Sequence, residues 1–343
     1  MKTYRAAIIG TGRIASLLER DPLRSKPHTH AGWYRHHPQI QLVAGSDVDP
    51  GRLAEFGSDW GIPADCLFPD YRQMLERVRP DIVSICAYAP QRLEQIEASI
   101  RCGARGLWIE KAIACSLQET AALTELLRTS GAKAIVDHPR RADPAYRAVR
   151  RLIRENTLGS LLEITCSMSG CLIHTGTHAY DMLDFWCGPV QRVAGWLEKQ
   201  QDERTSLEDC GGNGHIVFEN GVHAFVVGGS RNYYLFQFDL SFTGGRVLIG
   251  NDIRKVLLPA PSRLYSGFVE LFEEPGYELY DPYPRPMVYD LVHSLETGEE
   301  PLLSVENATT AFRTGLSIFQ SHLEGHRPVL PGELDERLCI VSV

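Results

Sequence analysis

The sequence lacks any run of apolar residues that could cross a bilayer. A membrane-spanning helix needs about 20 consecutive apolar residues, and no stretch of the 343-residue chain approaches that length. The first residues, Met1–Arg5, lead directly into a strand-like segment, without the apolar core or the cleavage site of a secretory leader. We therefore expect a protein that is neither inserted in a membrane nor exported.

The chain also lacks paired cysteines and a basic stripe. Its nine cysteines include no Cys-x-x-Cys pair, and their odd number and irregular spacing are typical of reduced thiols in a cytosolic protein. The formal net charge is -8, whereas nucleic-acid binding requires a basic surface. These features predict a cytoplasmic protein that has neither nucleic acid nor membrane among its partners.

Length and patterning predict two domains. A single hydrophobic core stops growing at about 250–300 residues, and this chain has 343 residues with 43% apolar and 23% charged, an ordinary globular balance. The alternation of strands and helices changes near residue 138. We therefore predict one domain at 1–137 and a second at 138–343.

The first predicted domain alternates short apolar strands with helices. Helical patterns are clearest at Arg92–Cys102 and Leu117–Thr129. Near-continuous apolar strands separated by helices indicate a parallel sheet buried on both faces, and hence an α/β Rossmann domain. The strands are expected at Ala6–Ile9, Gln41–Gly45, Ile82–Cys86, Leu107–Ile109 and Ala134–Val136.

In the second predicted domain, a helix at Pro144–Asn156 precedes strands that follow one another with only turns between them. Asn220-Gly221 and Thr243-Gly244-Gly245 are typical of hairpin turns. Successive strands without intervening helices predict an α+β domain with a largely antiparallel open sheet, followed by a helix at Val305–Leu323. The strands are expected at Leu161–Ser167, His215–Phe218, His223–Val227, Phe236–Phe242 and Arg246–Ile249.

A glycine-rich motif follows the first predicted strand and opens a predicted helix. Its form is G-x-G-x-x-A, and in this context the motif indicates a dinucleotide-binding turn. The first glycine permits the tight turn, the second lets the backbone approach a pyrophosphate, and the helix N-terminus favours negative charge. An ordinary glycine turn is the alternative. The residues concerned are Gly10-Thr11-Gly12-Arg13-Ile14-Ala15.

Asp47 stands at the end of the second predicted strand, where a carboxylate accepts hydrogen bonds from the ribose hydroxyls of a dinucleotide. Such a carboxylate repels a 2′-phosphate, so NAD is favoured over NADP as the cofactor. The alternatives are a solvated loop acid at Asp47 and a ribose-binding role for Asp49.

Asp47 lies further from the glycines than the usual ~20 residues, because an insertion at Asp21–Thr29 separates them. Prolines in this insertion interrupt the first helix, which we expect to resume at His30–His37. The insertion either contacts cofactor or substrate or is a structural loop. We expect the neighbouring pairs His28/His30 and His36/His37 to be solvated.

The ordered motifs resemble those of the Gfo/Idh/MocA oxidoreductase family. After the glycine motif come Glu110-Lys111-Ala112 behind a strand and Gly176–Asp181 at a later helix start, supported by Asp137–Arg141, Leu158–Ser160 and the 301–331 stretch. The resemblance implies a Rossmann domain followed by an α/β domain whose open sheet often makes oligomer contacts. It implies NAD(P)-linked chemistry on sugars, cyclitols and related alcohols, and a homo-oligomer, dimer or tetramer, assembled through the C-terminal sheet.

The resemblance aligns the family's E-K-P motif with Glu110-Lys111-Ala112 and its D-x-x-x-H pair with His174 and His178. Hydride transfer at a carbon requires a proton to leave or reach the attached oxygen. We expect His178 to be the acid/base partner and Lys111 to polarise the oxygen and share the proton. Glu110 is expected to position Lys111, and both residues are expected to contact the cofactor. An exposed lysine and a structural histidine are the alternatives.

Two positions depart from the family pattern: Ala112 replaces the proline and His174 replaces the acid. A neutral histidine offers no fixed negative charge, so His174 is expected to bind substrate or to be structural. Arg141 is expected to bind substrate or to form a salt bridge between the domains. His174, His178 and Asp181 have a spacing that suits a metal, but the cofactor supplies a sufficient role, so no metal is expected.

The leading hypothesis is an NAD(P)-dependent oxidoreductase that transfers a hydride between nicotinamide and a hydroxyl-bearing carbon of a sugar, cyclitol or related polyol. One alternative is an NAD-dependent enzyme that cleaves glycosides by transient oxidation and elimination. Another is a non-catalytic sensor of a dinucleotide or sugar. The changes at Ala112 and His174 motivate both alternatives, whereas the retained Lys111 and His178 argue against a sensor.

Overall fold

The computed structural model describes residues 3–201, 207–281 and 286–341. The chain divides into two compact units, 1–137 with 286–306 and 138–285 with 307–343. The sequence predicted a single boundary after residue 137, and the return of 286–306 to the first unit was not predicted. No helix in the described part of the chain is long and apolar enough to cross a membrane.

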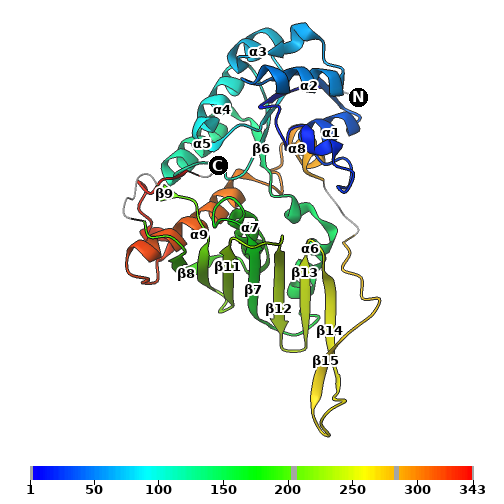
Figure 1. Ribbon diagram of the computed structural model, residues 1–343, viewed down its shortest axis with the longest axis vertical. Coiled ribbons are helices and arrows are strands. Elements are labelled where there is room, and N and C mark those ends of the chain that lie inside the picture. Colours follow the sequence, from blue (N-terminus) through cyan, green and yellow to red (C-terminus); the bar gives the residue numbers. More distant parts are fainter. Residues whose placement is uncertain (1–2, 202–206, 282–285, 342–343) are drawn as a thin grey trace. The chain divides into compact units, whose positions relative to one another are not determined.

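A six-stranded parallel sheet forms the centre of the first unit, with the strand order β3-β2-β1-β4-β5-β6. Residues 3–137 of this unit are coloured from blue to blue-green in Figure 1. All residues of β4 and β5 are buried, as expected for strands covered on both faces. The order reverses between β1 and β4, so ligands are expected at the carboxyl ends of these strands. The predicted Rossmann sheet is confirmed. Its strands are β1 (Tyr4–Ile9), β2 (Ile40–Ser46), β3 (Leu67–Phe68), β4 (Ile82–Ile85), β5 (Gly106–Ile109) and β6 (Lys133–Val136).

Helices and short 3-10 turns connect these strands. Three of the helices begin at capping side chains: Asp49, Asp70 and Ser116 each accept a hydrogen bond from a backbone N–H of the helix that follows. The elements are η1 (Leu17–Arg20), α1 (His30–His36), α2 (Pro50–Trp60), η2 (Ala64–Cys66), α3 (Tyr71–Val78), η3 (Ala89–Gln91), α4 (Arg92–Arg101) and α5 (Leu117–Ser130).

A helix from much later in the chain, α8 (Met287–Thr297), completes the first unit by packing on β5 and β6. Gly106 makes this contact possible, because a Cβ there would lie 3.0 Å from Leu295 Cδ1 and 3.1 Å from an Ile82 side-chain carbon. Close approach of α8 to the sheet therefore depends on a residue without a side chain.

The second unit is built on an eight-stranded sheet with the order β15-β14-β13-β12-β7-β11-β10-β8. Only β7 and β11 are parallel among its neighbouring strands in the described residues, so the predicted largely antiparallel sheet is confirmed. The predicted turn at Asn220-Gly221 joins β10 to β11, with Gly221 at φ 86. The strands are β7 (Leu161–Ser169), β8 (Val190–Leu197), β10 (Gly212–Phe218), β11 (His223–Gly229), β12 (Phe236–Phe242), β13 (Gly245–Gly250), β14 (Arg254–Pro261) and β15 (Val269–Glu273).

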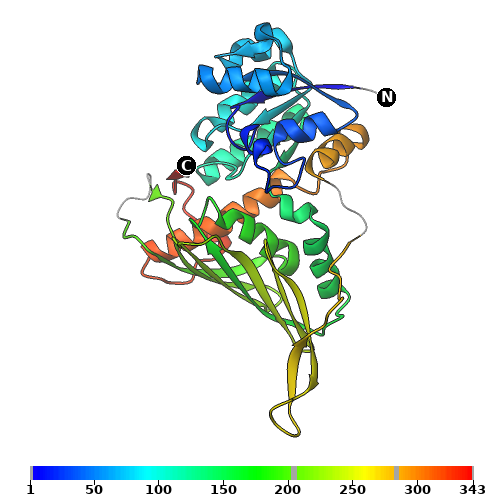
Figure 2. The ribbon, with the colours of Figure 1, turned by 45° about the vertical axis from the view of Figure 1, so that its right-hand side comes forward.

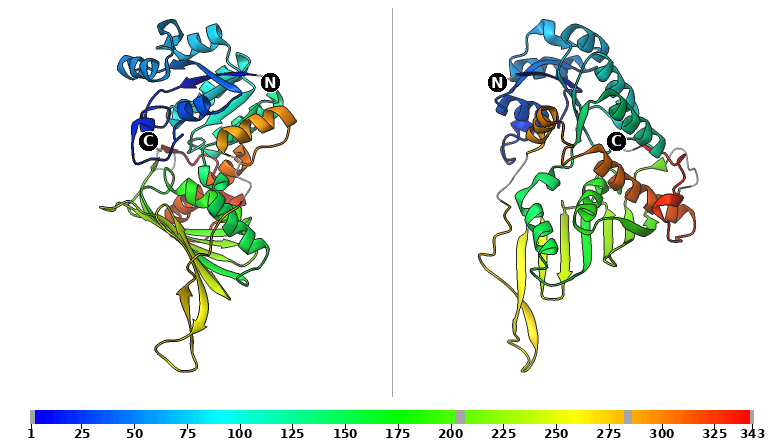
Figure 3. Two further views of the ribbon diagram at one scale, coloured as in Figure 1. Left: turned by 90° about the vertical axis from the view of Figure 1, so that its right-hand side faces the viewer. Right: turned by 180° about the vertical axis from the view of Figure 1, so that it is seen from behind.

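Helices cover one face of this sheet (Figure 3). The Trp186 and Tyr146 rings, from α7 (Gly176–Cys187) and α6 (Pro144–Arg154), contact Phe238 of β12. Ile318 of α9 (Val305–Leu323) lies against Gly195 and Gly214. Further elements of this unit are η4 (Pro139–Ala142), η5 (Pro331–Glu333) and a separate pair of short strands, β9 (Leu207–Glu208) with β16 (Ile340–Val341).

The opposite face of the eight-stranded sheet carries exposed apolar side chains. Trp196 lies on β8, and Phe225 and Val227 lie on β11, with β10 between the two strands. They share this face because their partners on β10, Asn213 and His215, alternate with the inward-facing Gly214. At the far edge, the β14–β15 hairpin extends beyond the other strands (Figure 2). Its turn exposes Tyr265.

Candidate dinucleotide and catalytic site

The glycine turn after β1 fits a dinucleotide. Gly10 has φ 84, and a Cβ there would lie 3.1 Å from the backbone N of Ala87 and 3.1 Å from the carbonyl carbon of Cys86, just beyond β4. Gly12 differs, because a Cβ there would meet nothing within 4 Å. Gly10 therefore allows the two loops to touch, whereas the outer side of Gly12 is open to an approaching ligand.

The backbone after the glycines offers donors for an anion. Within the described residues, the N–H groups of Gly12, Arg13 and Ile14 have no acceptor, and successive N–H groups of this kind bind phosphate. The sequence predicted that the motif opens an α-helix, but it opens turns and the short η1, because the insertion interrupts the helix. Phosphate binding here would rest on individual N–H groups more than on a helix dipole.

Asp47 lies directly beneath this turn and is buried. Its Oδ2 accepts hydrogen bonds from Thr11 N (2.8 Å) and Thr11 Oγ1 (3.2 Å), and its Oδ1 accepts one from Asp49 N (2.9 Å). A carboxylate has about four acceptor sites, so capacity remains for a ribose hydroxyl. The alternative acid, Asp49, caps α2, and its bond from Arg52 N leads the effects that lower its pKa.

The insertion folds back on η1 through Glu19. Its Oε2 accepts hydrogen bonds from His28 N (3.0 Å), Thr29 N (2.8 Å) and Thr29 Oγ1 (2.9 Å). Burial raises the pKa of Glu19, but these hydrogen bonds outweigh it and lower the pKa. Lys26 Nζ donates to Asp21 O at 2.8 Å. These contacts favour the structural-loop alternative, and the loop delivers the chain to the start of α1.

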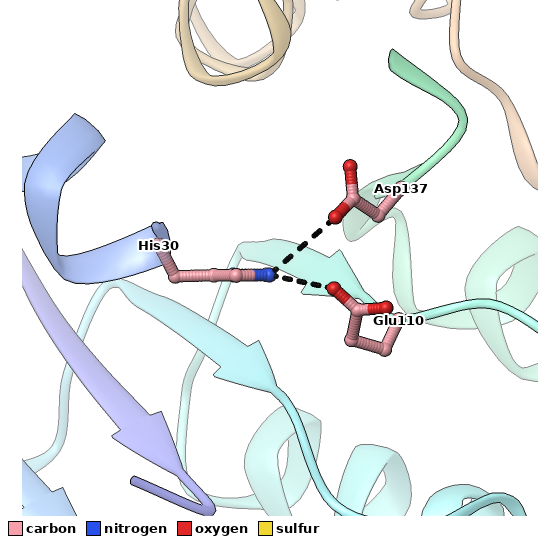
Figure 4. A group of neighbouring side chains, drawn as sticks. All are labelled: His30, Glu110 and Asp137. Carbon is pink, nitrogen blue, oxygen red and sulfur yellow. Dashed lines mark hydrogen bonds and ion pairs between the residues drawn. The ribbon is translucent and has the colours of Figure 1, made fainter. Parts of the chain in front are cut away.

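The first residue of α1, His30, was expected to be solvated, and this expectation is wrong. His30 is 1% exposed and its ring stacks on Trp108 at 3.8 Å between centroids. Its Nδ1 lies 2.8 Å from Ser84 Oγ and its Nε2 lies 3.0 Å from Glu110 Oε1. Figure 4 shows the His30 ring directed at Glu110 and Asp137, whose Oδ2 is 3.9 Å from Nε2. A buried polar cluster therefore lies beside Lys111.

Glu110 carries a fixed negative charge in this cluster. Burial by itself raises the pKa of Glu110, but the hydrogen bond and charge of His30, followed by Asp137 and Lys111, hold it at about 2. Lys111 is half-buried, follows β5 at the ligand edge of the sheet, and is joined to Ala112 by a cis peptide bond. The structure thus provides, from Glu110, a permanent anion next to the lysine.

The His30, Glu110 and Asp137 ligand atoms all lie within 4.8 Å of one another, a grouping that also suits a metal ion. However, Arg92 and Lys111 already face the Glu110 charge. A divalent ion would add two positive charges to this buried group, and it would have to displace the His30–Glu110 hydrogen bond. We therefore interpret the three residues as a hydrogen-bonded charge cluster.

The predicted histidines of the second unit lie at the start of α7. The half-buried His178 ring packs edge-on against His138 (5.3 Å between centroids) and Phe236 (6.5 Å). The Arg140 guanidinium covers the Phe236 ring at 3.8 Å. His138 belongs to the Asp137–Arg141 motif, but no role was predicted for it from the sequence. The surroundings of His178 therefore include the His138 and Phe236 rings and the Arg140 guanidinium on Phe236.

His174 is exposed in the turn that precedes α7. Its backbone N–H donates to Asp209 Oδ2 at 2.7 Å, and the N–H of Ile173 donates to Asp209 Oδ1 at 2.8 Å. Asp209 thus brings a carboxylate to the turn where the family pattern has an acid. The sequence gave no sign of it, because Asp209 is 35 positions away from His174.

Arg141 is buried and its donors are directed into α7. Its Nε donates to Asp181 Oδ1 at 3.0 Å, and its Nη2 donates to Asp184 Oδ2 at 3.1 Å. Both partners belong to the second unit, so the geometry favours an ion pair within that unit over the predicted substrate contact or a bridge between domains. Because it pairs with Arg141, the Asp181 carboxylate is directed away from the position that a metal bound jointly with His174 and His178 would require.

Comparison with known proteins agrees with this geometry. Residues 4–138 match the Gfo/Idh/MocA model, described as an oxidoreductase family with an NAD-binding Rossmann fold. By this match, residues 4–138 belong to the Gfo/Idh/MocA family of NAD-binding oxidoreductases. As in the family pattern, the chain keeps Lys111 and His178, while Ala112 and His174 stand at the two changed positions.

Two curated relatives and one solved structure illustrate the membership. The chain is 28% identical over 160 residues to D-apiose dehydrogenase of Paraburkholderia graminis, covering 47% of this chain and only 39% of that protein. It is 21% identical over 275 residues to dTDP-3,4-didehydro-2,6-dideoxy-alpha-D-glucose 3-reductase of Streptomyces antibioticus, covering 75% of this chain and 80% of the reductase. An Agrobacterium radiobacter oxidoreductase, solved with NAD+, L-tartaric acid and magnesium, shares the fold, with a TM-score of 0.74, 16% identity and coverage of 96% and 99%.

Proposed function

We propose that this protein is an NAD-dependent oxidoreductase that transfers a hydride between nicotinamide and a hydroxyl-bearing carbon of a sugar, cyclitol or related polyol. One observation carries the proposal: an open glycine turn with unused N–H donors and a lysine beside the permanently charged Glu110 stand at the carboxyl edge of the same sheet. The names of the two curated relatives, a dehydrogenase and a reductase of sugars, support the substrate class.

The bound dinucleotide supplies the hydride acceptor or donor. Lys111 polarises the reacting oxygen, and Glu110 keeps a compensating negative charge beside it. His178 takes or returns the proton at its imidazole, and His174 contacts a substrate hydroxyl. Arg141 holds α7, and thereby His178, through Asp181.

NAD is the preferred cofactor in this proposal. Asp47 holds Thr11 under the glycine turn, and a carboxylate at this place accepts a ribose hydroxyl and repels a 2′-phosphate. We expect NADH to bind at least ~10-fold more tightly than NADPH, and Asp47→Asn to narrow the difference. Quenching of protein fluorescence by each reduced dinucleotide measures both constants. Equal affinities in the wild-type protein would contradict the preference.

Residues 138–343, apart from the returning 286–306 segment, are proposed to bind substrate and to form a homo-oligomer, a dimer or tetramer. The outer face of the eight-stranded sheet exposes Trp196, Phe225 and Val227 together, and such patches mark association surfaces. Light scattering should give a multiple of the chain mass, and Phe225→Asp should reduce the measured mass.

A cytoplasmic location is proposed because all nine cysteines are free thiols.

The decisive experiment for the activity uses purified protein and a panel of polyols and sugars. We expect NADH absorbance to change with at least one compound, and Lys111→Ala and His178→Ala each to lower kcat by about 10²–10⁴-fold while NADH still binds. Lys199→Ala and His293→Ala, at exposed residues paired with Glu208 and Glu299, serve as controls. Unchanged turnover in both site variants would reject the roles. Glycoside cleavage without net NADH would favour the elimination mechanism instead.

A further inference from the structure

Arg92, the first residue of α4, is a buried cation that the proposed chemistry does not use. It is 3% exposed, and its guanidinium forms two hydrogen bonds to neutral carbonyl groups. Nη1 donates to Ala112 O, and Nη2 donates to Ala87 O at 2.9 Å. Ala87 lies in the loop after β4, whereas Ala112 is joined directly to Lys111 in the loop after β5.

The loop after β4 is also the loop that Gly10 touches. The backbone N of Ala87 lies 3.1 Å from the Cβ position of Gly10. One guanidinium therefore links the segment that supports the dinucleotide turn to the segment that carries Lys111. The planar fork of arginine can bond two acceptors at a fixed separation, which the point charge of lysine cannot do.

Burying this cation is unfavourable unless its charge and its donors are satisfied. Burial lowers the pKa of Arg92, and the charge of Glu110 is the largest effect that opposes this lowering. Glu110 thus acts electrostatically on both Arg92 and Lys111 without a direct hydrogen bond to the guanidinium, and the buried Nε of Arg92 has no hydrogen-bond partner among the described residues. Because burial of a charged guanidinium is unfavourable, its presence at the ligand edge of the sheet indicates a role beyond packing.

We propose that Arg92 is a positioning residue for Lys111, whose guanidinium fixes the spacing between the loop after β4 and the loop after β5. It thereby sets where the lysine amine stands relative to the dinucleotide turn. This inference deepens the proposed function and rests on it. Because misplacing a catalytic group by about 1 Å costs about 10²-fold in rate, Arg92 should govern kcat without contacting substrate.

The test compares Arg92→Lys and Arg92→Ala in the full chain, with NAD+ as hydride acceptor and a polyol that the wild type oxidises. Arg101→Ala, an exposed arginine on the same helix, is the matched control. We expect Arg92→Ala to lower kcat by about 10²-fold and Arg92→Lys by about 10-fold, with KM and the NADH dissociation constant within about 3-fold of wild type. Arg101→Ala should leave all three constants unchanged. Wild-type kcat in Arg92→Lys would overturn the proposal, because a point charge would then suffice.

Chemical rescue separates positioning from packing. Added guanidinium at millimolar concentration should restore part of the kcat of Arg92→Ala, whereas methylammonium should not, because only guanidinium reproduces the two-donor fork. Equal responses to the two cations would overturn the proposal. If Arg92→Ala does not fold, the result with Arg92→Lys decides.

Failure of the proposed function has a different signature. If the wild-type protein binds NADH but turns over no polyol, that function fails, and Arg92 is then tested by amide hydrogen exchange of residues 110–115 with NADH bound. Exchange there should be faster in Arg92→Lys than in the wild type and in Arg101→Ala. Equal exchange in all three proteins would overturn the role of Arg92.

Discussion

The proposed cofactor residues of the first unit and the proposed substrate residues of the second unit are held in different ways. In the first unit, Asp47, His30 and Glu110 are buried and joined by hydrogen bonds to the backbone turn or to one another. In the second unit, His178 is half-buried among rings, and the His174 side chain is exposed. The cofactor and lysine half is preorganised, whereas the half proposed to contact substrate is more open. A site needs its catalytic groups held rigidly, and the first unit meets this requirement better than the second.

The broadest effect is expected for Gly10→Ala, which should impair both stability and cofactor binding. The new methyl group would need φ 84 and would lie 3.1 Å from backbone atoms of Cys86 and Ala87, so we expect a loss of about 3 kcal/mol in the free energy of unfolding and loss of NADH binding. Gly12→Ala, with open space around its Cβ position, should keep wild-type stability and weaken only NADH binding. Thermal unfolding and NADH titration of both variants measure this contrast, and equal stability of the two would contradict it.

In the second unit, the most damaging change should be Arg141→Met. It leaves the buried Asp181 without its ion-pair partner, so we expect a loss of about 3–5 kcal/mol in the free energy of unfolding. The exposed Arg192→Met should stay within about 0.5 kcal/mol of wild type. Urea unfolding measures both values. A loss below about 1 kcal/mol for Arg141→Met would show that the second unit is not held by this buried pair.

Acid should weaken the first unit through Glu110. Its pKa of about 2 in the folded chain lies below the ordinary value of about 4.3. Ionised Glu110 therefore contributes stability above about pH 4.3, and this contribution is lost as the pH falls towards 2. We expect the difference in unfolding free energy between wild type and Glu110→Gln to shrink over this range. Comparing the two proteins removes the contribution of the other carboxylates, which titrate in both. A difference in unfolding free energy that stays constant with pH would contradict the prediction.

The smallest effect on stability is expected for His174→Ala. Because the side chain is exposed, the free energy of unfolding should change by less than about 0.5 kcal/mol. KM for the substrate should nevertheless rise by about 10-fold, because a hydrogen bond to a substrate hydroxyl is lost. Steady-state kinetics measure this, with His36→Ala, exposed on α1, as the control. An unchanged KM would mean that His174 is structural.

Local patterns predicted much of the fold. Five of the six strands of the first sheet, all but the short β3, follow from apolar runs, and the start of α1 at His30 and both ends of α9 follow from prolines and helical periodicity. The helix α8 was missed, as was its return to the first unit, since its partners β5 and β6 lie far back in the chain. The edge strand β15 and its neighbour β14 were missed too, because strands with many exposed side chains carry a weak apolar signal.

The residues of the candidate site differ in the same way: those set by local sequence were predicted, and those set by distant contacts were not. Gly10 and Gly12 are recognisable because a single turn requires them two positions apart in the chain. The partner of His30, Glu110, is 80 positions away, and a histidine next to a proline-rich insertion gives no local sign of burial. Arg92 reads as an ordinary surface residue at a helix start, and only the fold brings Ala87 and Ala112 to its two donors.

Calorimetric titration of the full chain with reduced dinucleotides tests the central claim most directly. We predict a single site per chain for NADH, weaker binding of NADPH, and no measurable heat of binding in Gly10→Ala. If the wild-type protein takes up neither NADH nor NAD+, the glycine turn is not a cofactor site and the assignment of Lys111 and His178 falls with it.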